Sequence, residues 1–543
     1  MSNARKRASA MSVIPQLLAA LKSNGFRRCE EQPSSSHLVI EGSLSTRFGG
    51  IPCLVRIDRT FQSFPLVQLT PVPERLLPVA PHIGPAGSLC YIADATAVVD
   101  IFDPIGQTLA ALDQAARVLD QIMAGERVND LAEEFYAFWS GIQFFVDVDS
   151  RETGTGVLLQ IGDAFAVSDK PERTTAKLAH LPGKLRELPW SIDRVTTKTA
   201  PRPKSDVWPP ETVRELLAWQ SGLDDACRRK IEARIARAYR QGRAFAVVVI
   251  DSPLMPYAFA TLDLLKTPRK SSRDQRLPIY DVRILCLNLI RIDDAFVTQR
   301  NIPGQTTLAG LRIAMVGVGT IGGYLGEMLA RAGAGTAGGE LMLVDNQILE
   351  PGNLGRHRLG ANNSFLPKAT SLADEIKRVM PGLNVRPITY DAREVNLEEF
   401  DLLIDATGEQ ALGQWLAARH SQKTPLLHIW IEGAGVAVRS YISSHASEGC
   451  YRCLCDYERR GDFTAVEGGV EPLFAGQGCE GPYVPFSASV SIQAAALGLD
   501  SVMAWVGRKA WPGLSTRVLS RAHEAANADC TVLKRPGCPA CSS

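Results

Sequence analysis

A glycine-rich segment past the middle of the chain has the residue types needed to hold the phosphates of a nucleotide. In LRIAMVGVGTIGG, Gly317, Gly319 and Gly322 form the pattern G-x-G-x-x-G directly after an apolar run. Glycine lets the backbone turn sharply and approach a phosphate, and the helix expected to start at Gly322 would direct free N–H groups at it. Asp345, which closes the next strand in LMLVD, is placed to bind a ribose hydroxyl. The pattern by itself indicates a dinucleotide or ATP.

Four polar residues after Asp345 distinguish between these two ligands. Asn353 and Arg356 follow that aspartate by eight and eleven positions. Lys368 lies in FLPKAT, and Asp405 closes a strand in DLLIDATG. Hydride transfer requires none of them, whereas cleavage of ATP between its α- and β-phosphates requires cations for the pyrophosphate and a carboxylate for Mg²⁺. Each residue has an ordinary structural alternative, such as a helix cap or a solvated charge, but the combination favours an adenylating enzyme that uses ATP and Mg²⁺.

Two pairs of cysteines have the spacing of a structural zinc site. CYRC contains Cys450 and Cys453, and CPAC near the end of the sequence contains Cys538 and Cys541. Each C-x2-C pair can supply two thiolates, and two pairs complete the tetrahedral set of ligands that Zn²⁺ prefers. Buried thiols without a metal are the alternative. A zinc ion would tie the last residues back to their own domain.

Cys479, in FAGQGCEGPYVPFSAS, has the surroundings of a reactive thiol. A glycine-rich stretch precedes it, and a helix rich in small residues is expected just beyond, over Ser487–Leu497. A cysteine near a helix N-terminus can have a lowered pKa and attack as the thiolate. A buried, inert cysteine is the alternative. We predict that Cys479 is a nucleophile.

Together these motifs resemble the ThiF/MoeB/ubiquitin-activating family, over roughly residues 305–543. The resemblance implies adenylation of a protein's C-terminal carboxylate with release of pyrophosphate. In several activating enzymes of this kind the position of Cys479 carries the cysteine that receives the acyl group. Members usually form homodimers through the adenylation domain, and an arginine before the first strand can reach the partner's ATP site; Arg300 is the nearest candidate. The family's aspartate at the position of Gln347 is absent here.

A second resemblance lies in the N-terminal part of the chain. PHIGPAGSLCYIADATAVVDIFDP, which is followed by a long helix, resembles the active-site stretch of ubiquitin-conjugating enzymes. Gly87 and Cys90 match that family's glycine three residues before its catalytic cysteine. His82 lies eight residues before Cys90, where the family has an asparagine that supports an oxyanion. The resemblance implies that Cys90 carries an acyl group as a thioester and that His82 replaces the asparagine as donor.

An activating domain behind a conjugating domain resembles the fusion enzymes of bacterial CBASS antiphage operons. The resemblance implies a ligase that forms an adenylate, a thioester on Cys479, a thioester on Cys90 and finally an amide on a target lysine. The modifier would be a cyclic oligonucleotide synthase or, in related operons, a ubiquitin-like protein.

The elements expected around these residues fall into three parts of an α/β protein. Residues 1–150 have strands first and a long helix after them, which is the order of an α+β, ubiquitin-conjugating-like domain. Residues 151–300 form a mixed α/β linker domain with a proline-rich arm at 191–210. Residues 301–543 alternate strand and helix and are expected to form a doubly wound, Rossmann-like adenylation domain.

The charge and apolar composition of the chain restrict the kinds of partner that it can bind. The chain has 543 residues, of which 59 are basic and 58 acidic, so the net charge is +1. This balance attracts neither nucleic acid nor an anionic membrane, and neither is expected as a partner. The longest apolar runs, such as AFAVVVI, are far shorter than the ~20 residues of a membrane span. We therefore expect a cytoplasmic protein whose 12 cysteines serve metal binding and catalysis rather than disulfides.

Three other functions stay open on the sequence. A ThiF- or MoeB-like sulfur-carrier adenylyltransferase would need only the third part and leaves Cys90 unexplained. In a non-catalytic nucleotide-binding scaffold the motifs would serve folding and recruitment, although the retention of the cations, the second aspartate and Cys479 argues against it. An NAD oxidoreductase would use the same glycine loop, and NAD bound to the purified protein would favour it.

Overall fold

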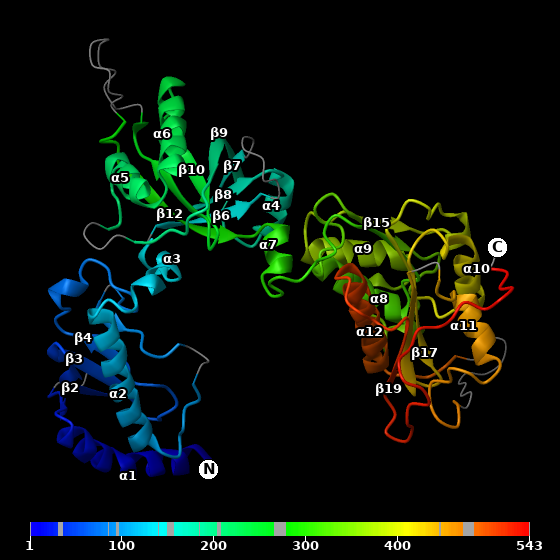
Figure 1. Ribbon diagram of the computed structural model, residues 1–543, viewed down its shortest axis with the longest axis horizontal. Coiled ribbons are helices and arrows are strands. Elements are labelled where there is room, and N and C mark those ends of the chain that lie inside the picture. Colours follow the sequence, from blue (N-terminus) through cyan, green and yellow to red (C-terminus); the bar gives the residue numbers. More distant parts are fainter. Residues whose placement is uncertain are drawn as a thin grey trace. The chain divides into compact units, whose positions relative to one another are not determined.

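The computed structural model describes residues 2–30, 36–84, 86–93, 97–139, 141–148, 157–183, 185–203, 208–264, 279–444, 447–470 and 483–541 (Figure 1). By its internal contacts the chain divides into two compact units. The first comprises Met1–Phe145, Glu152–Leu158 and Leu188–Ile290. The second comprises Val146–Arg151, Leu159–Glu187 and Arg291–Ser543.

The N-terminal part of the first unit is an antiparallel sheet with two helices. Five strands pair in chain order: β1 (Arg27–Arg28), β2 (His37–Thr46), β3 (Gly49–Asp58), β4 (Leu66–Leu69) and β5 (Ser88–Leu89). α1 (Ser2–Ser23) contacts α2 (Pro104–Met123), and α2 contacts β2 (Figure 1). Alternate residues of β3, such as Val55 and Ile57, are buried beneath these helices, as expected for a sheet with one covered face. The predicted α+β order is confirmed.

Seven strands in the middle of the chain form a closed barrel in the order β10–β11–β12–β6–β8–β7–β9. These strands are β6 (Ile142–Asp147), β7 (Val157–Ile161), β8 (Ala164–Ser168), β9 (Leu185–Thr196), β10 (Val247–Asp251), β11 (Tyr257–Thr261) and β12 (Ile284–Arg291). The helices of this region are η2 (Val128–Ala132), α3 (Phe135–Phe138), α4 (Pro171–Lys177), α5 (Val213–Leu223), α6 (Asp225–Arg240) and α7 (Asp294–Gln299). The prediction of an exposed arm at 191–210 is wrong at its start, because β9 runs to Thr196, pairs with β10 and buries Val195.

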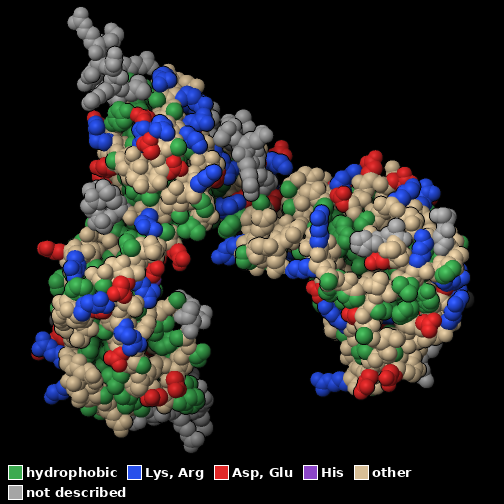
Figure 2. All heavy atoms as spheres, viewed as in Figure 1, with side chains coloured by type: hydrophobic (Ala, Val, Ile, Leu, Met, Phe, Trp, Pro, Cys, Tyr) green, Lys and Arg blue, Asp and Glu red, His purple; other side chains and the backbone are tan. Residues whose placement is uncertain are grey.

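Arginines of α6 form ion pairs with nearby carboxylates. On α6, Arg228 contacts Glu232, and Arg237 contacts Asp193 of β9. Figure 2 shows acidic and basic side chains spread over the viewed face of each unit. This distribution agrees with the net charge of +1.

A seven-stranded sheet forms the centre of the second unit, in the order β15–β14–β13–β16–β17–β18–β19. Its strands are β13 (Arg312–Val316), β14 (Glu340–Val344), β15 (Val385–Ile388), β16 (Leu402–Asp405), β17 (Leu426–Glu432), β18 (Ala437–Ser443) and β19 (Leu514–Val518). β13 to β17 run parallel, and β18 and β19 are antiparallel to their neighbours. The helices are α8 (Thr320–Arg331), α9 (Lys368–Val379), α10 (Gln410–His420), α11 (Tyr451–Glu458) and α12 (Ala488–Val506). The predicted Rossmann-like domain is confirmed.

Within the described residues, α12 is the one helix whose length and apolar composition would let it cross a membrane. Half of that apolar stretch is buried, and the helix packs against α8, β17 and β18. A Cβ at Gly498 would overlap the side chain of Ile429, so the small residues of α12 allow a close approach to the sheet. Packing in the core therefore accounts for the apolar composition of α12.

Candidate active sites

The glycine-rich turn joins β13 to α8, and its three glycines have different tasks. Gly317 has a φ of +90°, and a Cβ there would lie 2.8 Å from Thr407. A Cβ at Gly322 would overlap the carbonyl oxygen of Gly317, so glycine there lets α8 pack against the turn. Gly319 lines a cavity. Gly319 is also the N-cap of α8, which therefore begins at Thr320, two residues before the predicted start.

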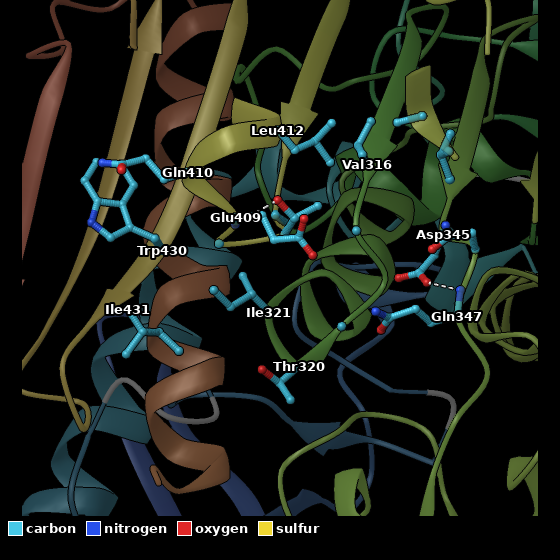
Figure 3. A pocket seen from close by; sticks show the side chains of 18 of the residues that line it. Val316, Thr320, Ile321, Asp345, Gln347, Glu409, Gln410, Leu412, Trp430 and Ile431 are labelled. Atoms are coloured by element: carbon cyan, nitrogen blue, oxygen red, sulfur yellow. Dashed lines mark hydrogen bonds between the residues drawn. The ribbon is translucent and has the colours of Figure 1, made fainter. Parts of the chain in front are cut away.

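A cavity of about 640 Å³ opens at the carboxyl ends of the parallel strands. Asp345 and Gln347 lie at one end of it and Trp430 at the other, with Ile321 and Leu412 between them (Figure 3). Ligands of open α/β sheets bind at this edge, outside the carboxyl ends of the strands. The cavity is therefore the candidate site for the nucleotide and for the group that it activates.

Asp345 is anchored to the glycine turn. Its carboxylate accepts hydrogen bonds from the backbone N–H of Val318, at 2.7 Å, and of Gln347, at 2.8 Å. The sequence analysis missed His357, whose Nε2 lies 2.8 Å from the carbonyl oxygen of Val318 and whose Nδ1 accepts from the N–H of Leu359. Burial lowers the pKa of His357, which agrees with a neutral ring that carries its hydrogen on Nε2. A lone histidine in RHRLG offers no pattern that would have revealed this role.

Lys368 is a buried cation beside the cavity. It is the first residue of α9 and is only 6% exposed. Its Nζ donates to Oε1 of Gln347 over 2.7 Å, and it makes no ion pair with a carboxylate of the described residues. Gln347 lines the cavity, so the ammonium group of Lys368, which has no carboxylate partner among the described residues, contacts a residue of the cavity wall. Such a charge is costly to bury without an anion, and a polyphosphate would supply one.

Arg356 lies at the edge of the cavity that the segment after Cys479 forms. Its Nη1 donates to the carbonyl oxygen of Val484 over 2.7 Å, and its guanidinium lies 4.3 Å from the centre of the Phe486 ring. Both Val484 and Phe486 line the cavity. Asn353 supports this loop, because its Oδ1 accepts from the N–H of Glu350 and its carbonyl oxygen accepts from the N–H of Arg356. The structure thus places Asn353 and Arg356 beside the cavity without making them part of its lining.

Asp405 ends β16 and is 4% exposed. One carboxylate oxygen accepts from the N–H of Thr407, at 3.1 Å, and from its hydroxyl, at 2.6 Å. The other oxygen lies 2.9 Å from Nδ1 of His428. Ala406 and Thr407 line the cavity directly after Asp405. The carboxylate is therefore held rigidly at the carboxyl edge of the sheet, where the sequence places it.

The end of the cavity around Trp430 contains charged residues that the sequence analysis missed. Trp430 donates through Nε1 to Glu432 over 2.7 Å. The buried guanidinium of Arg439 contacts Glu432, at 3.2 Å, and Glu458, at 2.6 Å. Burial raises the pKa of Glu458 although Arg439 opposes this effect. The alternation of IWIEG along β17 is the one sequence signal that could have indicated Trp430 and Glu432 as a pair on one face.

The four cysteines of the two C-x2-C pairs are brought together. Their sulfur atoms lie within 4.8 Å of one another, and all four residues are buried: Cys450, Cys453, Cys538 and Cys541. Burial raises the pKa of Cys450 and raises that of Cys541 to about 11. Thiols held so close in an apolar setting are the arrangement that a tetrahedral Zn²⁺ site requires.

Cys90 lies directly after β5, in a groove of about 830 Å³ within the first unit. Apolar residues such as Leu66 and Ile92 line much of this groove. Cys90 is the exposed cysteine among those that the structure describes. By contrast, burial raises the pKa of Cys53 and Cys227 to about 11, so these thiols are suited to a structural role.

His82 holds the backbone of Cys90 through its carbonyl oxygen, which accepts from the N–H of Cys90 over 2.8 Å. Its ring is occupied on both sides. Nε2 lies 2.9 Å from Asp130, and Nδ1 lies 2.6 Å from Glu134. The predicted donation from His82 to an oxyanion at Cys90 would require one of these two contacts to break. The geometry assigns His82 instead to the support of the loop that carries Cys90. The backbone of His82 itself has a φ of +61°.

Cys479 lies outside the described residues. The chain is described again from Tyr483, four positions later, where Val484 and Phe486 line the nucleotide cavity. Arg300, the predicted arginine for a partner's site, is exposed at the end of α7.

Comparisons with known proteins agree with this arrangement. The ThiF family model matches residues 295–509, and the prokaryotic E2 family B model matches residues 17–143. The ATP-dependent ubiquitin transferase-like protein Cap2 of Pseudomonas aeruginosa is 46% identical over 98% of this chain and 100% of its own length. Cap2 of Escherichia coli strain TW11681 is 25% identical, over 91% of each chain. The molybdopterin-synthase adenylyltransferase of E. coli K12 is 30% identical over 31% of this chain and 68% of its own.

The fold and the two sites define a protein that joins a ThiF-type adenylyltransferase domain to a ubiquitin-conjugating-like domain. The chain belongs to the Cap2 family of ATP-dependent ubiquitin transferase-like proteins. It is an activating and conjugating enzyme of that class, as the two resemblances in the sequence predicted.

Proposed function

We propose that the chain ligates the C-terminus of a modifier protein to target amines in four steps. The modifier's terminal carboxylate attacks the α-phosphorus of ATP, and pyrophosphate leaves, which gives an acyl adenylate. The thiolate of Cys479 attacks the acyl carbon, and AMP leaves. The thiolate of Cys90 then displaces Cys479. A target lysine amine finally displaces Cys90, loses its proton and forms an amide.

One observation carries this proposal: an exposed cysteine lies in the groove of a conjugating-like domain that shares its chain with an adenylation cavity. A sulfur-carrier adenylyltransferase would need the cavity alone. Cys90, its groove and the loop that His82 supports would then have no use. We therefore prefer the hypothesis of a ligase over those of a sulfur-carrier adenylyltransferase and of a non-catalytic scaffold.

The residues around the cavity fit ATP. The N-terminus of α8 and the glycines at 317 and 319, which line the cavity, are proposed to bind the phosphates, while Gly322 lets α8 pack against the turn. Asp345 is proposed to bind the ribose. Lys368, with its uncompensated charge, and Arg356 stabilise the pyrophosphate that leaves. Asp405 offers the carboxylate oxygen that Mg²⁺ prefers, and this ion would neutralise charge on the phosphates.

Arg356 links the nucleotide to the first thiol. Its contact with Val484 ties the loop after Asn353 to a segment that begins only a few residues beyond Cys479. This contact ties the described segment that follows Cys479 in the sequence to the cavity. Cys479 is therefore the proposed acceptor of the acyl group from the adenylate.

The four-cysteine cluster is proposed to hold one Zn²⁺, which would join α11 to the last residues of the domain. Its role is structural, because four protein ligands leave no open position for a substrate.

The partners follow from the same resemblance. The modifier is proposed to be a cyclic oligonucleotide synthase or a ubiquitin-like protein, in a CBASS-type antiphage system in the cytoplasm. The adenylation domain is proposed to form a homodimer. We divide the chain into a conjugating domain at 1–150, a linker domain at 151–300 and an adenylation domain at 301–543.

Trapping the intermediates on a gel without reducing agent tests the relay. With ATP and the modifier, Cys479→Ala should form the adenylate but no thioester. Cys90→Ala should hold the modifier as a thioester on Cys479 and yield no product. Cys29→Ala, a change at a partly exposed thiol of the same N-terminal domain, is the matched control and should conjugate normally. Target modification at the normal rate by Cys90→Ala would refute the conjugating role.

A further inference from the structure

Two aromatic side chains pack beside the carboxylate of Asp405: His428 contacts it, and Tyr451 stacks on His428. His428 lies on β17 directly opposite Asp405 in the parallel pair β16–β17, and its Nδ1 is 2.9 Å from Oδ2 of Asp405. His428 is 1% exposed, and its Nε2 has no hydrogen-bond partner among the described residues. Since an ionised carboxylate only accepts hydrogen bonds, Nδ1 carries the hydrogen and donates it. Among the described residues the ring is thus bonded to Asp405 alone.

Tyr451 fixes the plane of the His428 ring. The two rings stack with their centres 4.1 Å apart and an angle of 18° between their planes. Tyr451 also meets Trp430 edge to face, at 5.8 Å, and it lines the nucleotide cavity. Because His428 has few polar contacts of its own, this stacking decides how Nδ1 is aimed at Asp405.

Tyr451 lies within one of the C-x2-C pairs of the cysteine cluster and also lines the cavity. It lies between Cys450, the N-cap of α11, and Cys453, and both cysteines contact their counterparts near the end of the domain, at 3.8 Å and 3.5 Å. The backbone of Tyr451 is therefore fixed by the cluster while its ring reaches the cavity.

Gly413 of α10 completes the packing. A Cβ at this position would lie 2.8 Å from the Tyr451 ring and 2.9 Å from Oδ2 of Asp405. Glycine inside a helix is less favourable than alanine. The close approach of these two side chains is the physical reason for glycine here.

We propose that His428 and Tyr451 are positioning residues for adenylation, which orient Asp405 toward Mg²⁺·ATP and couple that carboxylate to the four-cysteine cluster. This proposal rests on the proposed function, in which Asp405 serves the metal. His428 sets the direction of one carboxylate oxygen, while Thr407 sets the other. Tyr451 transmits the position of α11 to His428.

The test uses ATP binding to the full chain, measured by calorimetry with and without Mg²⁺. His428→Phe keeps the ring that Tyr451 stacks on and removes the N–H donor, whereas His428→Asn keeps an N–H near the same place. We expect His428→Phe to reduce the gain in ATP affinity due to Mg²⁺ by about 10- to 100-fold, the usual effect of removing a partner of a metal ligand. Affinity without Mg²⁺ should not change, and His428→Asn should restore part of the gain.

His420→Phe is the matched control, since His420 is a buried histidine that packs against Trp415 on α10 and does not line the cavity. It should keep the full gain from Mg²⁺. Tyr451→Leu should lose the gain in the same way as His428→Phe, with Tyr457→Leu on the same helix as its control. Zinc content and unfolding temperature, measured on each variant, separate a local effect from loss of the fold.

Two results would overturn the proposal. If His428→Phe and Tyr451→Leu both retain the gain in ATP affinity due to Mg²⁺, the two residues have no positioning role, and the proposed ligase is unaffected. ATP binding by the unchanged chain that gains nothing from Mg²⁺ removes the metal role of Asp405, and the positioning role fails with it. Failure of the thioester relay, with the gain from Mg²⁺ still sensitive to His428, would contradict the ligase alone.

Discussion

The ammonium group of Lys368 donates to the side-chain oxygen of Gln347 over 2.7 Å, at the end of the cavity where Asp345 also lies. The family that the sequence resembles has an aspartate at the position of Gln347, so the residue that Lys368 contacts here is a neutral amide. Lys368 makes no ion pair with a carboxylate of the described residues, and its contact with Gln347 joins it to the lining of the cavity.

Lys368→Met separates function from stability. Pyrophosphate exchange with ATP in the presence of the modifier should fall by about 10²- to 10³-fold, the usual loss when one donor to a developing charge is removed. The unfolding temperature should stay the same or rise, because a buried cation without a carboxylate partner destabilises the fold. Arg378→Met, at the exposed end of the same helix, is the control and should exchange normally. Parallel losses of exchange and stability in Lys368→Met would mean that the lysine is structural.

Asp405→Ala should abolish pyrophosphate exchange, because Mg²⁺ and the phosphates would lose the carboxylate that positions them. Asp405→Asn preserves the shape of the side chain and should also abolish exchange. This result would show that the lost charge, and not the space left by a smaller side chain, is the cause. Asp401→Asn is an exposed change just before the same strand and should leave exchange intact. Exchange at the full rate by either Asp405 variant contradicts the assignment.

The purified protein should contain about one zinc per chain, as expected for four cysteine ligands. Cys538→Ser should lose the metal and lower the unfolding temperature of the adenylation domain, since the free energy of metal binding is part of the free energy of folding. Elemental analysis and thermal unfolding measure the two effects. Cys530→Ser, outside the cluster, should change neither. A Cys538→Ser protein that is metal-free and equally stable refutes the zinc site.

The contact between His82 and Asp130 predicts a pH dependence of stability through the carboxylate. The hydrogen bond from His82 is the largest cause of a lowered pKa at Asp130. A lowered pKa in the folded state means that Asp130 stabilises the fold above its ordinary pKa of about 3.9 and loses this effect as the pH falls through the lowered value. The difference in unfolding temperature between the unchanged chain and Asp130→Asn should thus be present at neutral pH and shrink in acid. Glu133→Gln, an exposed neighbour, should show no such trend. A difference that is constant with pH counts against the pair.

Local patterns carried much of the prediction. The glycine turn, Asp345 and Asp405 were predicted as site residues because a strand, a tight turn and a helix start impose their residue types within a few positions. Their roles stay predictions. The cysteine pairs were identified for the same reason, since two ligands of one knuckle must be close in sequence. The start of α8 and the start of the exposed arm at 191 were predicted wrongly, because capping by Gly319 and pairing of β9 with β10 overrode the local signals.

The sequence alone thus indicates the groups on which the predicted chemistry depends: a glycine turn suited to a phosphate, an acid at a strand end, four cysteines with the spacing of zinc ligands and a cysteine after Gly87. What holds these groups in place depends on the tertiary structure. Asp405 meets His428, Arg356 meets Val484, and His82 meets Asp130 and Glu134, across 23 to 128 positions of sequence. Such contacts depend on the order and register of strands and on the packing of helices, and no spacing along the chain encodes them.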